Sequence, residues 1–197
     1  MGIFNRKNCD ICGEKPGLTG ARKLEDGNMC GKCTKKLSPF TTDRKKTSLA
    51  DIKDHLAYRE ANIPKVAEFR VSRQLGGSTK VLIDESGGTF IVTPSNKWQS
   101  ENPDVINISQ VISCSSDVRE TRNEIKMQNA QGKTVSYRPP RYEYEYDFYI
   151  NIQVNSPYFN QINFKLNNFR VDRGTGIYRD MENQVYDIQQ ALQPRQR

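Results

Sequence analysis

The first regular pattern in the chain is a helical one. Apolar residues recur every three to four positions at Leu49, Ile52 and Leu56, which is the spacing of an amphipathic helix. Just before them, Ser48 and Asp51 have the spacing of a capping box at a helix start. We therefore expect a helix to begin at Ser48 and to run to about residue 61. We expect it to stop at Pro64, because proline cannot donate the helical hydrogen bond.

From residue 65 the apolar period changes to two, which predicts strands. The segment Val66–Arg73 reads as one strand, and Lys80–Asp84 with Thr89–Thr93 reads as a hairpin around a glycine turn. Shorter alternating segments follow before the two prolines at 139 and 140. These segments are Val105–Ile108, Gln110–Cys114, Glu124–Met127 and Thr134–Tyr137. Cys114 is expected to act as a small buried apolar residue.

The clearest strand follows Pro139 and Pro140. Between Tyr142 and Val154 the even positions are aromatic or aliphatic, while most odd positions are acidic or amide residues. This alternation predicts one apolar and one polar face. We interpret the tyrosines as core residues rather than a stacking platform. The acids of the polar face are interpreted as a solvated surface, namely Glu143, Glu145 and Asp147.

The last segment returns to a helical period. Its apolar residues step by three and four and are followed by Pro194; they are Tyr178, Met181, Val185, Ile188 and Leu192. We expect this amphipathic helix to dock on the sheet, with homo-oligomer formation through it as a secondary possibility. The whole pattern predicts an α+β chain with about seven antiparallel strands closed by a C-terminal helix. That is the element order of a pleckstrin-homology-like domain.

Two pairs of cysteines, Cys9 with Cys12 and Cys30 with Cys33, precede all of these elements. Two CxxC pairs at this separation suit a tetrahedral Zn²⁺ with four thiolate ligands. Disulfides and a redox motif are less favoured, because Met1 to Lys7 contain no apolar leader segment and no βαβ unit surrounds the cysteines. The four cysteines fill all positions of a tetrahedral site and leave none for water or a substrate. The expected cofactor is therefore one structural zinc per chain.

The residues around the cysteines predict the small fold that holds the metal. An Asp26-Gly27 turn between the pairs indicates a short hairpin, and a helical turn follows Cys33. Cysteine pair, hairpin, cysteine pair and short helix is the order of a treble clef, with a zinc ribbon as the alternative. We divide the chain into a zinc-binding head (1–40), a linker with a helix (41–64) and a β-rich domain closed by the C-terminal helix (65–197).

Charge is concentrated in the first part of the chain. The 197 residues carry a net charge of +7, and residues 1–50 contain 11 Lys/Arg against 5 Asp/Glu. The candidate patch for an anionic partner consists of Arg22, Lys23, Lys32, Lys35 and Lys36, and Arg44, Lys45 and Lys46 extend the basic cluster. Such a patch is able to bind the phosphate backbone of a nucleic acid. We favour the interpretation that these charges keep a small metal-folded unit soluble. No apolar run reaches the length of a membrane span, and a cytoplasmic location is expected.

Several motifs resemble those of a bacterial family with an N-terminal four-cysteine zinc-ribbon domain of unknown function followed by a β-rich domain. The motifs lie at Cys9–Gly13, Leu24–Cys33, Lys36–Pro39, Leu56–Glu60, Thr79–Asp84 and Arg138–Tyr149. The resemblance implies a bacterial origin and a four-cysteine metal site, and it implies no activity.

The sequence gives little support to an enzyme. The only histidine, His55, is expected on the exposed face of the first helix, and four of the five cysteines are assigned to metal. We therefore predict a non-enzymatic zinc-binding adaptor with a protein partner. Nucleic-acid binding by the basic head is the alternative, and anionic-lipid binding by the pleckstrin-homology-like domain is the second alternative.

Overall fold

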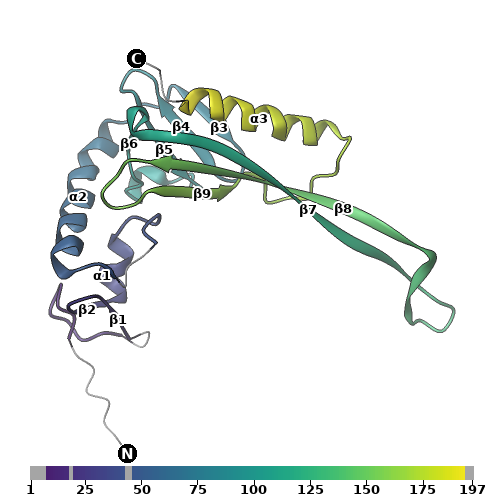
Figure 1. The fold of residues 1–197 in the computed structure, drawn as a ribbon, viewed down its shortest axis with the longest axis horizontal. Helices are drawn as coiled ribbons and strands as arrows, with labels where there is room; N and C mark the ends of the chain where they lie inside the picture. Colours follow the sequence, from purple (N-terminus) through teal and green to yellow (C-terminus); the bar gives the residue numbers. More distant parts are fainter. Residues whose placement is uncertain (1–7, 18–19, 43–45, 194–197) are drawn as a thin grey trace, which may run out of the picture.

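The computed structural model describes residues 8–17, 20–42 and 46–193. Met1 to Lys7, Arg44, Lys45 and Pro194, which enter the predictions above, lie outside the described residues. The chain forms an N-terminal head, a long helix, a two-sheet body and a projecting two-stranded ribbon (Figure 1). The predicted α+β class, with antiparallel sheets and a C-terminal helix, is confirmed.

The head contains the predicted hairpin and short helix. Strands β1 (Ala21–Lys23) and β2 (Asn28–Cys30) pair antiparallel across the Asp26-Gly27 turn, and helix α1 (Gly31–Lys36) follows directly. A separate small core fills this unit, and it includes Leu24, Met29, Leu37 and, from the long helix, Ile52. The head therefore packs on the long helix through apolar residues.

Helix α2 (Leu49–Glu68) starts as predicted but continues further. Ser48 and Asp51 form a complete capping box, with each side chain accepting the other residue's backbone N–H. The predicted end at Pro64 is wrong. Pro64 lies on the exposed side of the helix, where water can satisfy the carbonyl that it leaves without a partner. Val66 and Phe69 then pack against the first sheet and hold the last turn in place.

The body consists of two antiparallel sheets. The first has the order β3-β4-β5-β6 and the second the order β7-β8-β9. Their strands are β3 (Arg73–Gly76), β4 (Lys80–Asp84), β5 (Thr89–Thr93), β6 (Ile106–Asn107), β7 (Val111–Gln128), β8 (Thr134–Val154) and β9 (Gln161–Lys165). Two 3-10 turns complete it, η2 (Trp98–Ser100) and η3 (Ile108–Gln110).

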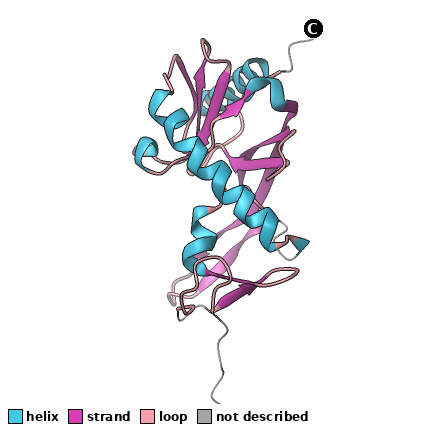
Figure 2. Cartoon of the chain, turned by 90° about the vertical axis from the view of Figure 1, so that its left-hand side faces the viewer, coloured by secondary structure: helices cyan, strands magenta, loops and turns pink. Residues whose placement is uncertain are grey.

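The hairpin of β4 and β5 has the predicted bounds and is buried on both faces. Val81 and Phe90 face the main core, whereas Leu82 and Ile91 face α2. The predicted strand over residues 66–73 is wrong, because β3 starts only at Arg73. Val66 belongs to α2, where it packs against Leu82 and Ile91 on the face of the hairpin that points to the helix. Figure 2 shows α2 running diagonally from the head to this sheet.

Helix α3 (Gly176–Leu192) closes the body as predicted. Its seam of Met181, Val185, Ile188 and Leu192 is buried in the main core, together with Phe148, Ile150 and Ile162 of the second sheet. The seam that suggested self-association is thus already occupied within one chain. Cys114 is partly buried against the same core, which fits its expected apolar role.

Strands β7 and β8 continue far beyond β9. They pair from Val111 opposite Val154 to Gln128 opposite Thr134, while β9 covers only Tyr149 to Gln153 of β8. The predicted strand start after Pro140 is wrong, because β8 already begins at Thr134. Both prolines lie in a four-residue bulge between the pairs Ile125–Arg141 and Lys126–Ser136. No ladder hydrogen bond is needed from a proline at a bulge, so the strand passes through.

Candidate metal centre

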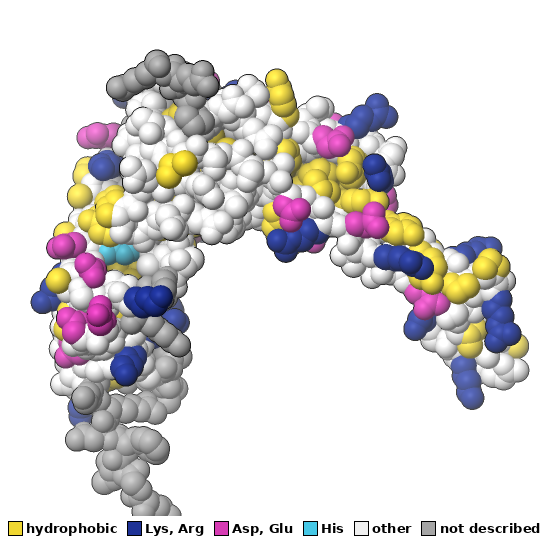
Figure 3. All heavy atoms as spheres, viewed as in Figure 1, with side chains coloured by type: hydrophobic (Ala, Val, Ile, Leu, Met, Phe, Trp, Pro, Cys, Tyr) yellow, Lys and Arg dark blue, Asp and Glu magenta, His cyan; other side chains and the backbone are white. Residues whose placement is uncertain are grey.

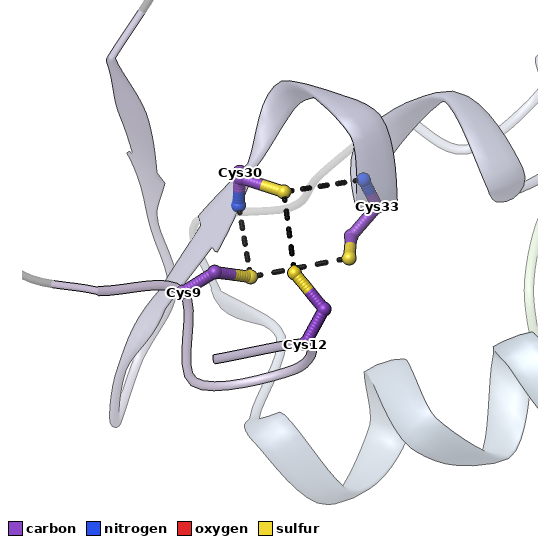
Figure 4. A group of neighbouring side chains, drawn as sticks. All are labelled: Cys9, Cys12, Cys30 and Cys33. Atoms are coloured by element: carbon purple, nitrogen blue, oxygen red, sulfur yellow. Dashed lines mark hydrogen bonds between the residues drawn. The ribbon is translucent and has the colours of Figure 1, made fainter. Parts of the chain in front are cut away.

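The four predicted cysteines meet at one point of the head (Figure 4). Cys9 and Cys12 come from the loop before β1, Cys30 ends β2, and Cys33 lies in the first turn of α1. The Sγ atoms of Cys9 and Cys33 are 3.9 Å apart, and those of Cys12 and Cys30 are 3.7 Å apart. All four sulfurs lie within 4.8 Å of one another. A tetrahedron with metal–sulfur bonds of about 2.3 Å has sulfur–sulfur separations of about 3.8 Å, so the cluster can coordinate a metal ion.

Backbone hydrogen bonds hold the sulfurs in this arrangement. The N–H of Cys30 donates to Sγ of Cys9 (3.2 Å), and the N–H of Cys33 donates to Sγ of Cys30 (3.5 Å). The first cysteine loop is tied to β2 because Asp10 accepts the N–H of Asn28 at 2.7 Å. These bonds form when the hairpin and α1 form, so the fold of the head positions the ligands.

The electrostatics of the cluster suit a cation. Burial opposes ionisation of Cys9, but backbone N–H groups, first that of Cys30, outweigh it and lower the pKa of this thiol to about 6. Burial raises the pKa of Cys33 well above its ordinary value. One thiolate is therefore favoured near neutral pH, whereas Cys33 needs the charge of a bound metal to release its proton. The protein supplies four ligands, which leaves no position for a substrate in a tetrahedral complex.

The basic residues of the head lie on two different elements, β1 and α1. Arg22 and Lys23 lie on β1, and Lys32, Lys35 and Lys36 lie on α1, all with exposed side chains. Lys32 forms an ion pair with Glu14 at 2.9 Å, so part of the charge of the predicted patch is balanced locally.

A buried polar cluster that the sequence did not reveal joins the head to the body. Arg59 of α2 pairs with Asp104 of the body, with 2.6 Å between Nη1 and Oδ1. Asp104 also accepts the hydroxyl proton of Ser38, which follows α1, at 2.7 Å. The guanidinium further donates to the carbonyls of Lys36 and Asn102. One ion pair thus connects three parts of the chain.

The loop at residues 102–105 is held against α2 by amides as well. Asn62 donates to Asn102 and to the carbonyl of Pro103, both at 2.7 Å, and accepts the N–H of Val105 at 3.0 Å. Asn102 adopts a positive φ of 50° and donates to the carbonyl of Arg59. The one sign of this cluster in the sequence is that Arg59 and Asn62 lie on the same face of the helix as the apolar Ile52. Polar residues on an apolar helix face suggest that they have buried hydrogen-bond partners.

His55 belongs to the same junction, so its predicted exposed position is wrong. Only 3% of it is exposed. Its Nε2 accepts the N–H of Ser38 at 3.2 Å, and its ring stacks on Tyr158 with 4.7 Å between the ring centroids. The head covers this side of α2, which the helical pattern alone treats as surface.

Geometry and chemistry together define a module whose four sulfurs can coordinate a metal ion, attached to a two-sheet body. Residues 7–55 match the family model DUF4428, described as a domain of unknown function. The match ends within α2, and the wider resemblance over the β-rich part stays a prediction. No curated protein and no solved structure matches the chain significantly. None of the helices in the described ranges combines the length and apolar character that a membrane crossing requires.

Proposed function

We propose that this chain is a non-enzymatic interaction protein in which a zinc ion has a structural role. The observation that carries the proposal is the buried junction of Ser38, Arg59 and Asp104, which fixes the metal-binding head to the body. A protein that holds two surfaces at a set distance and orientation can bring partners together. The metal then serves to keep the head folded rather than to react.

Zinc is the metal that best fits the cluster. Four thiolates at near-tetrahedral separations are typical of structural zinc, and the observed 3.7 and 3.9 Å match that geometry. The small core of the head is too limited to fold alone. Zinc binding supplies about 10–16 kcal/mol of apparent free energy at pH 7, which is enough to fold such a unit.

The side chains best suited to catalysis have structural partners, which supports a non-enzymatic role. The imidazole of His55 is held in the junction. Of the acidic row on β8, Glu143 pairs with Arg170 at 2.6 Å, and Asp147 pairs with Lys165 at 2.7 Å.

The two alternatives rest on weaker observations. Nucleic-acid binding by the head would use Arg22, Lys23, Lys35 and Lys36, since Lys32 is paired with Glu14. Anionic-lipid binding rests on the element order of the body, in which sheets of four and three strands are followed by α3. That order is the basis of the pleckstrin-homology-like interpretation, and such an analogy of fold brings no ligand with it.

Affinity capture from the native cell tests the proposal. The wild-type chain is compared with Cys9→Ser/Cys12→Ser, and Cys114→Ser is the matched control outside the metal cluster. The lysate is treated with nuclease, so that only protein partners are scored. We expect the wild type and Cys114→Ser to retain a reproducible partner that the double variant loses. A substrate conversion that copurifies with the wild type and disappears in the double variant would contradict the proposal.

A further inference from the structure

Within the described part of the chain, no other strand or helix lies beside the outer part of the β7–β8 ribbon (Figure 1). The last backbone bonds from the body to β8 are those that join Leu166 to Phe148 (2.8 Å) and Tyr146 to Val171 (3.0 Å). We call residues 122–144, which lie beyond these bonds, the arm. Six residue steps separate Arg122 from Gln128, so at about 3.4 Å per residue the arm extends roughly 20 Å past its base. Two-stranded ribbons are marginally stable alone. We therefore expect an exposed ribbon of this length to serve a function rather than the stability of the fold.

The arm is basic and its cations are available. It contains five Lys/Arg and two Asp/Glu residues, a formal charge of +3. The five basic side chains are exposed and take part in none of the ion pairs of the described residues; they are Arg122, Lys126, Lys133, Arg138 and Arg141. Of the two acids, Glu143 is already paired with Arg170. Figure 3 shows the dark-blue side chains gathered at the end of the arm.

Tyrosines hold two of these arginines in place. The guanidinium of Arg122 lies 3.5 Å from the ring centroid of Tyr142, and that of Arg141 lies 4.6 Å from that of Tyr137. Stacking orients a guanidinium and leaves its N–H groups at the plane edge free for an anion. The arm therefore presents pre-oriented donors of the kind that bind phosphate oxygens.

We infer that the arm binds a nucleic-acid duplex through its phosphate backbone. A two-stranded β-ribbon fits the major groove of B-form DNA, and lysine and arginine contacts to phosphates supply most sequence-independent affinity. Figures 1 and 3 show that the arm and the head are the two ends of an arch with a hollow between them. A hollow surface with basic residues at both ends complements a convex polyanion.

The exposed apolar side chains of the arm, among them Ile125 and Met127 at 37% and 39% exposure, lie along its strands, whereas the turn at its end is polar and argues against insertion of that end into a membrane. The turn that joins the strands runs from Asn129 to Lys133 and contains no aromatic or large aliphatic residue. The side chain of Asn129 accepts the N–H groups of Gln131 and Lys133 at 3.0 and 2.9 Å, which fixes a polar turn. Insertion into a bilayer interface requires apolar residues such as Trp, Phe or Leu at the contact.

Fluorescence anisotropy with a labelled 25-base-pair DNA duplex tests this inference on the full zinc-loaded chain. The inference names a partner for the interaction protein proposed above and rests on that proposal. If all five basic residues contact phosphates, log affinity should fall with log salt at a slope of about −4.5. That slope corresponds to a loss of roughly 500-fold in affinity between 50 and 200 mM salt.

The decisive variant is Lys126→Ala/Lys133→Ala/Arg138→Ala, which leaves both stacked arginines intact. With two contacts remaining, the slope should be about −1.8, and the same rise in salt should cost roughly 12-fold. The matched control is Lys53→Ala/Lys65→Ala/Arg70→Ala. It removes the same charges from exposed positions on and just after α2, on the side of the molecule away from the arm (Figure 1). Equal far-UV circular dichroism and melting temperature show that both variants are folded.

Weaker binding and a smaller slope for the arm variant alone support the inference. It is overturned if the wild type binds no duplex at 50 mM salt, or if the two variants lose equal affinity. It is also overturned if vesicles with phosphatidylserine, and not the duplex, bind in an arm-dependent way. Capture of a protein partner from nuclease-treated lysate is independent of the arm's charge, so these failures leave the proposed function standing.

Discussion

Replacing Asp104 with alanine should separate the head from the body more effectively than any surface change. Its carboxylate is the shared acceptor for the Arg59 guanidinium (2.6 Å) and the Ser38 hydroxyl (2.7 Å). The side chains of Arg59 and Asp104 are 9% and 0% exposed. Without the carboxylate, a guanidinium that cannot release its proton stays buried with only backbone carbonyls as acceptors.

The expected cost follows from this environment. Removing one partner of a buried ion pair destabilises a protein by about 3–5 kcal/mol. Because Arg59 keeps its bonds to the carbonyls of Lys36 and Asn102, we expect Asp104→Ala to lie at the lower end, about 3 kcal/mol. Replacing both partners, as Arg59→Met/Asp104→Leu, should cost less than Asp104→Ala alone, since no buried charge is left and only neutral groups, the Ser38 hydroxyl and the carbonyls of Lys36 and Asn102, lose a partner.

Urea unfolding of zinc-loaded protein at pH 7, followed by far-UV circular dichroism, measures these values. Asp54→Ala is the control, because it removes one exposed carboxylate from α2 and should change stability by less than about 0.5 kcal/mol. The reasoning is refuted if Asp104→Ala costs under about 1 kcal/mol. It is equally refuted if the double variant is as unstable as the single one.

The same pair predicts a pH dependence. Burial raises the pKa of Asp104 above its ordinary value, against the lowering effects of Arg59 and Ser38. A carboxyl whose pKa is raised in the folded state stabilises below its unfolded pKa, and this contribution is lost as the pH rises through the folded pKa. Arg59→Met removes the main opposing effect and raises the folded pKa further. Its destabilisation should therefore be largest at pH 7 and shrink towards pH 4, and a penalty that stays constant over this range would contradict the assignment.

Three further predictions concern the metal, one turn and the core. Metal analysis of protein purified without chelator should give one zinc per chain, and Cys9→Ser should lower this value; unchanged metal content would exclude the four-cysteine site. Gly76 has a φ of +86°, and a Cβ there would lie 2.5 Å from the carbonyl oxygen of Thr79, so Gly76→Ala should destabilise by about 1–3 kcal/mol in urea unfolding. Ile188 is fully buried in the main core, and Ile188→Ala should cost about 2–5 kcal/mol in the same measurement. A smaller cost would mean that the surrounding residues collapse into the space that the side chain leaves.

Local signals predicted the elements whose causes are local. The capping box at Ser48, the hairpin of β4 and β5 and the seam of α3 depend on residues that are close to one another in the sequence. The cysteine cluster belongs to this class as well, because its spacing within 25 residues limits how the sulfurs can meet. Such features can be predicted from the sequence without knowing which other elements pack against them.

The junction was not predictable because its cause is tertiary. Whether His55 or Asn62 is buried depends on the head and the loop at residues 102–105, which cover α2 from two sides. The continuation of α2 past Pro64 has the same origin, since the apolar surface of β4 and β5 holds Val66 and Phe69. The pattern within one segment shows which face of a helix is apolar. It does not show how many other parts of the chain pack against that helix.

The tyrosine row of β8 shows how this limit bears on function. The alternation predicts that every even residue from 142 to 154 faces the core, and this is correct from Tyr146 onward. Tyr142 and Tyr144 instead are 38% and 40% exposed, because the segment from Leu166 to Val171 that covers β8 ends at Tyr146. On the arm, the ring of Tyr142 packs on Arg122 in place of a core. The same face of one strand therefore stabilises the body at one end and orients an arginine at the exposed other end.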